Sequence, residues 1–89
     1  MSRLEEKLKE LGYEQCRSRD YDLKNLTTYL KAIPNNHILI YFNPESNSVD
    51  YYKVVPHYAF HNQEDVDFLQ DSMNTLKKDL EILKVELTK

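Results

Sequence analysis

The last third of the chain carries a heptad pattern, which constrains the fold more than any other feature of the sequence. Large apolar residues recur there at alternating spacings of three and four, at Val66, Leu69, Met73, Leu76, Leu80, Leu83 and Leu87. This spacing is typical of an amphipathic helix with one continuous apolar seam. Asn62 stands before it as a helix cap, with Asp65 three residues later. The pattern therefore predicts a helix from Asn62 to about Leu87, roughly 38 Å long.

A helix of this length is longer than a small sheet would cover, so part of it must pack on something else. If Val66 takes heptad position a, Asp79 of one helix would face Lys84 of a parallel partner. An antiparallel helix pair can use the same seam. The chain's own sheet and an N-terminal helix are the alternative partners, because a second apolar face lies off the seam, at Phe68, Ile82 and Val85.

We predict a homodimer through this helix, and we include tyrosines of the sheet in the interface. Seven of the 89 residues are tyrosine, a residue with a large contact area and a polar end that favours interfaces. Filling the core and stacking on bases are the other uses of these rings, and base stacking normally needs more basic neighbours than Lys53. The predicted interface therefore comprises the seven residues of the seam together with Tyr51 and Tyr52.

The beginning of the chain predicts a short helix. Ser2 and Glu5 form a capping box, and Gly12, the only glycine, stands where a left-handed C-terminal cap would need it. We expect this helix to run from about Arg3 to Leu11.

The middle of the chain predicts strands. Leu26–Ile33, His37–Phe42 and Ser48–Val55 are rich in β-branched and aromatic residues and are separated by turns that contain proline and asparagine. Both faces of the second strand are apolar, so we place it at the centre of the sheet. We expect Val49, Tyr51 and Val55 on one face of the third strand. Tyr13–Arg17 is a candidate fourth strand, followed by a loop at Arg19–Asn25.

The predicted fold is therefore α+β: an N-terminal helix, a small antiparallel meander sheet of three to four strands, and a long C-terminal amphipathic helix. The length of the chain favours one domain, residues 1–89. Its longest apolar run, Ile38–Phe42, is too short to cross a bilayer, and its first residues lack the apolar core of a signal peptide. We expect a cytoplasmic protein.

Charge argues against nucleic acid as a partner. The net charge is −3, and the acidic excess lies after Asn62, where acids come early and lysines late, as the dipole of a helix favours. No basic patch is present to neutralise phosphates.

The sequence contains no motif of catalysis or cofactor binding. His57 and His61 have the i,i+4 spacing of metal ligands, but Pro56 argues against a helix there. Cys16, the only cysteine, has no catalytic signature around it and suits a packing role. We therefore expect no metal, no cofactor and no enzymatic activity.

The tract YYKVVPHYAFHNQEDVDFLQDSMNTLKKDLEIL resembles the C-terminal half of small proteins encoded by phages and prophages of Gram-positive bacteria. In these, a tyrosine-rich strand leads into a helix that opens like residues 62–70 here, NQEDVDFLQ. The resemblance implies a phage or prophage accessory protein, without an assigned activity, in the cytoplasm of the host cell. Because of the heptad seam, the tyrosine-rich sheet and the lack of a reaction centre, we expect this protein to act through protein contacts. The alternative is a host-directed inhibitor, of the anti-defence type, that uses an acidic helix face at Glu64, Asp67 and Asp71.

Overall fold

The computed structural model describes residues 3–16, 26–57 and 61–87. Two helices and four strands follow one another along the chain: α1 (Arg3–Glu10), β1 (Glu14–Cys16), β2 (Thr27–Ile33), β3 (Asn36–Asn43), β4 (Ser48–Pro56) and α2 (Gln63–Leu87). This arrangement confirms the predicted α+β fold. The side chain of Ser2 and the loop expected at residues 19–25 lie outside the described residues. Neither of the two helices is long and apolar enough to span a membrane, within the residues described.

The sheet is an antiparallel meander in the order β1-β2-β3-β4. The apolar strand β3 lies inside it, between β2 and β4, as its two apolar faces predict. Asparagine residues make both of the tight turns possible, because asparagine tolerates a positive φ better than most residues. Asn35 joins β2 to β3 at φ 63°, and Asn47 joins β3 to β4 at φ 52°.

Both helices are capped by the residues that the sequence singles out. Gly12 adopts φ 98°, and the amides of Gly12 and Tyr13 donate to the carbonyls of Lys9 and Leu8, both at 3.0 Å. These are the two bonds of a Schellman cap. At the start of α2, the Asn62 side chain accepts from the amide of Asp65 at 3.0 Å, and the Asp65 carboxylate accepts from the amide of His61 at 2.9 Å.

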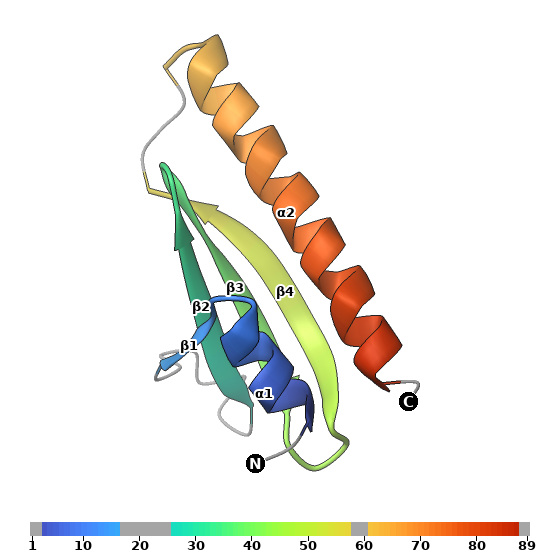
Figure 1. The fold of residues 1–89 in the computed structure, drawn as a ribbon. Coiled ribbons are helices and arrows are strands. Elements are labelled where there is room, and N and C mark those ends of the chain that lie inside the picture. Colours follow the sequence, from blue (N-terminus) through green and yellow to red (C-terminus); the bar gives the residue numbers. More distant parts are fainter. Residues whose placement is uncertain (1–2, 17–25, 58–60, 88–89) are drawn as a thin grey trace.

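Both helices cover the same face of the sheet (Figure 1). The core between the two layers contains buried side chains from both helices, from β2 and β3 and from the link after α1: Leu4, Leu8, Tyr13, Tyr29, Ile38, Ile40, Phe42, Leu76 and Leu83. α2 contacts α1, β3 and β4, and its first turns extend beyond the end of the sheet (Figure 1). The sheet therefore does not cover the first turns of α2.

A bulge in β4 corrects one prediction about the faces of that strand. The register pairs Tyr41 with Tyr51 but Phe42 with Val49, so Asp50 is the extra residue. Because directly opposed residues share a face, Val49 joins Tyr52 and Val54 on the side of the helices. The prediction that Val49 lies with Tyr51 and Val55 is therefore wrong, since a strict period of two does not hold across a bulge.

The difference between the two sides of α2 predicts a difference in stability. Leu83 is 1% exposed in the core, whereas Val85, two residues later, is 56% exposed. We expect Leu83→Ala to lower the free energy of unfolding by about 2–5 kcal/mol, because it leaves a cavity. The matched variant Val85→Ala should change it by about 0.5 kcal/mol or less. Urea denaturation followed by circular dichroism measures both, and equal losses would contradict the observed rotation of α2.

Candidate protein interface

The rotation of α2 on the sheet is set by an inner face that contains two polar residues. This inner face comprises Ser72, Leu76, Asp79 and Leu83, all of them buried. The carboxylate of Asp79 accepts a hydrogen bond from the Tyr13 hydroxyl at 2.8 Å and forms an ion pair with the Lys31 ammonium at 3.0 Å. Burial and the neighbouring Asp79 carboxylate both raise the pKa of Tyr13, so its hydroxyl stays a donor. Asp79 is thereby satisfied inside the fold.

A second polar contact fixes α2 further along its axis. The side-chain amide of Asn36 donates to the Ser72 hydroxyl at 3.0 Å, and that hydroxyl donates to the carbonyl of Phe68 at 2.8 Å. Buried polar groups need such partners, so the two contacts favour one rotation and one axial position of the helix.

This rotation divides the predicted seam between the inside and the outside of the chain. Leu76 and Leu83 belong to the core, and the side chain of Leu87 lies outside the described residues. The others form what we call the outer flank: Val66 and Met73 are 45% and 50% exposed, and Leu69 and Leu80 are half-buried. Asp79 is held by Lys31 within the chain, so the parallel coiled-coil contact of Asp79 with Lys84 of a second copy does not fit this structure.

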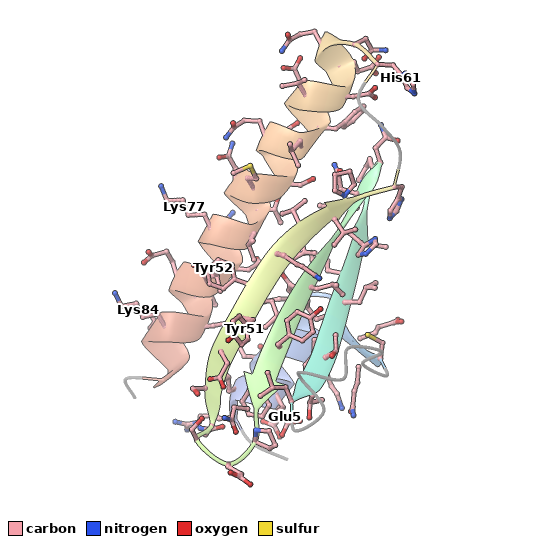
Figure 2. All side chains as sticks on the ribbon, turned by 180° about the vertical axis from the view of Figure 1, so that it is seen from behind. Glu5, Tyr51, Tyr52, His61, Lys77 and Lys84 are labelled. Atoms are coloured by element: carbon pink, nitrogen blue, oxygen red, sulfur yellow. The ribbon has the colours of Figure 1, made fainter. Side chains whose placement is uncertain are left out.

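A groove of about 380 Å³ runs between the outer flank and β4. Tyr52, which is 56% exposed, lies between the strand and the helix (Figure 2). The groove is lined by Tyr52, Gln70, Met73, Asn74, Leu76, Lys77 and Leu80. Figure 2 also shows Lys77 and Lys84 projecting from α2 away from the sheet. The surface therefore combines apolar contact area with a basic rim.

Tyr51 does not belong to this groove. It pairs with Tyr41 across β3 and β4, on the face of the sheet opposite to the helices, and it is 57% exposed. Consecutive residues of a strand point to opposite faces, so Tyr51 and Tyr52 serve different surfaces. Of the predicted interface, the structure brings together Tyr52, Met73 and Leu80, beside the buried Leu76.

Two of the three histidines, His37 and His57, form a pair. Nε2 of His57 lies 2.8 Å from Nδ1 of His37, and the two ring centroids are 4.9 Å apart. His61 stands at the start of α2 (Figure 2). No group of three or more metal-ligating side chains occurs within residues 3–16, 26–57 and 61–87. The shared hydrogen bond requires that at least one ring of the pair be neutral.

Cys16 ends β1 and is half-buried. Burial raises the pKa of its thiol, which lowers the fraction of nucleophilic thiolate at neutral pH. The acids Glu64, Asp67 and Asp71 are exposed and so remain accessible to a partner.

Comparison with models of protein families, with curated proteins and with solved structures gives no significant match. The resemblance to phage and prophage proteins therefore stays a prediction.

The histidine pair generates a prediction about pH. Burial, the neighbouring His57 and Lys53 lower the pKa of His37 below its usual 6.5, in that order of size. Protons therefore bind the unfolded chain more readily than the folded one, so the contribution of His37 to stability should be lost as pH falls below 6.5. We expect NMR titration to give His37 a pKa below 6.5, and His57→Gln to raise it part of the way back. A pKa at or above 6.5 in the unaltered protein would contradict the paired arrangement.

Proposed function

We propose that the chain is a non-enzymatic accessory protein, of the kind that phages and prophages encode, which acts through protein contacts and assembles as a homodimer through the outer flank of α2. The observation that carries the proposal is the exposure of Val66 and Met73 on one helix flank, with Met73 beside Tyr52 in the groove. Apolar groups gathered beside a groove and rimmed by lysines are typical of interaction surfaces. The resemblance of residues 51–83 to phage proteins adds the biological setting.

The size of the chain supports the same proposal. An 89-residue chain buries a smaller share of its surface than a larger domain does, and association is one of the ways in which small proteins gain stability. The inner face of α2 is fully used within the chain. The outer flank is the part of the seam that association would cover.

This proposal predicts the effect of one charge on the outer flank. We expect the unaltered protein to approach twice its chain mass of 10.7 kDa in light scattering as the concentration rises. Met73→Lys should shift the mass to that of a folded monomer, because an ammonium group would be buried in an apolar contact.

Val85→Lys is the matched control, since Val85 is exposed to a similar extent, 56% against 50% for Met73, on another face of the same helix. It should leave the assembly unchanged. A monomer at every concentration, or equal dissociation by both variants, would refute the proposed interface.

A second candidate function is a host-directed inhibitor, for which the exposed acids of α2 are the favouring observation. Glu64, Asp67 and Asp71 recur at spacings of three and four on the early turns, so they share one face away from the outer flank. Such a face suits a basic protein surface. The test is capture of a basic protein from a Gram-positive lysate, compared with a variant in which all three acids are replaced by lysine. Capture that survives this charge reversal, or no capture at all, would refute the candidate.

A further inference from the structure

The backbone holds the pair of His37 and His57 from two sides. His37 lies in β3, directly opposite Val55 of β4. His57 follows β4, and its amide donates to the carbonyl of Asn35, in the turn between β2 and β3, at 3.0 Å. Each ring therefore starts from a backbone position that the sheet or its turn fixes, so the close contact between the rings is part of the fold.

The separation of the two facing nitrogens suits one metal ion as well as a hydrogen bond. Nδ1 of His37 and Nε2 of His57 are 2.8 Å apart. An imidazole nitrogen binds zinc at about 2.0–2.1 Å, so two nitrogens at adjacent corners of one ion lie about 2.8 Å apart at a right angle and about 3.4 Å apart at the tetrahedral angle. The observed separation matches the right angle, which is typical of tetragonal copper and nickel sites.

The protonation of the pair also suits a metal ion, because a metal ligand is a neutral imidazole. Burial, His57 and Lys53, in that order of size, lower the pKa of His37, so this ring is neutral at pH 7. In the hydrogen bond, one of the two facing nitrogens carries a proton. For both to bind a metal ion, that proton moves through solvent to the other nitrogen of the same ring, and the rings turn until their lone pairs meet. Both rings stay neutral in this exchange.

Solvent reaches the pair, and one positive charge lies near it. His57 is exposed and His37 is half-buried. His37 lies on the face of the sheet opposite to the helices, because its neighbour Ile38 belongs to the core. Lys53 of β4 is close enough to lower the pKa of His37. Its charge opposes a bound cation, so it should limit the affinity of the pair without removing a ligand.

We propose that His37 and His57 together bind one divalent transition-metal ion, with Cu²⁺ preferred over Zn²⁺ and over Mn²⁺. The preference follows from the order of affinities that nitrogen ligands show for these metals. No third metal-binding side chain joins the pair in the part of the chain that the structure describes, so water completes the coordination. The sequence spaces His57 and His61 as ligands, but the fold brings His57 to His37 instead. One chain suffices for this site, so it does not depend on the proposed dimer.

Titration with Cu²⁺ tests the site in the full chain. The titrated protein carries Cys16→Ala, because a free thiol reacts with this ion. Calorimetry should give one Cu²⁺ bound per chain, and electron paramagnetic resonance should show two nitrogen ligands. We expect His57→Gln to weaken binding by at least about tenfold, because a single ligand loses the advantage of two linked ones. His37→Gln should do the same, and circular dichroism checks that both variants remain folded.

His61→Gln is the matched control, since His61 stands at the start of α2 and outside the pair (Figure 2). It should leave the number of bound ions and the affinity unchanged.

Two further changes should move the affinity in opposite directions. Lowering the pH below 6.5 protonates imidazole rings, so Cu²⁺ binding should weaken. Lys53→Gln removes the positive charge beside His37, so we expect Cu²⁺ to bind about two- to five-fold more tightly.

Several results would overturn the metal site. Binding of Cu²⁺ that survives both His37→Gln and His57→Gln uses other ligands, and so does binding that is lost equally in His61→Gln. Mn²⁺ that binds as tightly as Cu²⁺ would indicate oxygen ligands instead of imidazoles. A protein that binds no Cu²⁺ at pH 7 overturns the metal site as well. It leaves the proposed homodimer standing, because light scattering tests that assembly separately.

Discussion

The buried carboxylate of Asp79 is the constraint on which the arrangement of this protein depends. A buried charge is costly unless it is paired and hydrogen-bonded. The two partners of Asp79 come from separate parts of the chain: Lys31 from β2, and Tyr13 from the link between α1 and β1. The Lys31 ammonium also lies 5.3 Å from the centre of the Tyr13 ring. One side chain of α2 thus joins the sheet, the end of the first helix and the last helix, and rotating α2 away from this position would break both contacts.

Much of this fold is predictable because its signals are local. Gly12 ends α1 with a positive φ, which glycine adopts at little cost. Asn62 and Asp65 begin α2 by accepting hydrogen bonds from backbone amides only a few residues away. The strands are predictable for the same reason, since their turns are set by Asn35 and Asn47. The bulge at Asp50 is not, because the extra residue is defined by the partner strand and leaves no mark on the local pattern of β4.

The rotation of α2 is the part that the sequence pattern could not decide. Leu76 and Leu83 belong to two overlapping series. One is the heptad seam that continues through Met73 and Leu80, and the other is the inner face that includes Ser72 and Asp79. A reading of the sequence by hydrophobicity favours the first series, because serine and aspartate are expected to face solvent. Only the positions of Lys31, Tyr13 and Asn36, which lie far away in the sequence, show that both polar residues face inward. Strand geometry alone places Tyr51 and Tyr52 on opposite faces of the sheet. Which of the two lies beside α2 depends on the position of that helix.

The surface that we propose for interaction is consequently what remains of the seam after the inner face has been used. Because Asp79 and Ser72 hold α2 through specific polar contacts, Met73 is directed outward by the same bonds that bury Leu76 and Leu83. A partner on the outer flank therefore meets a surface that is already formed, and association need not be coupled to a rearrangement of the core. Binding to the folded form alone stabilises that form, so association at the outer flank, as we propose it, would add stability to a chain whose own core is small.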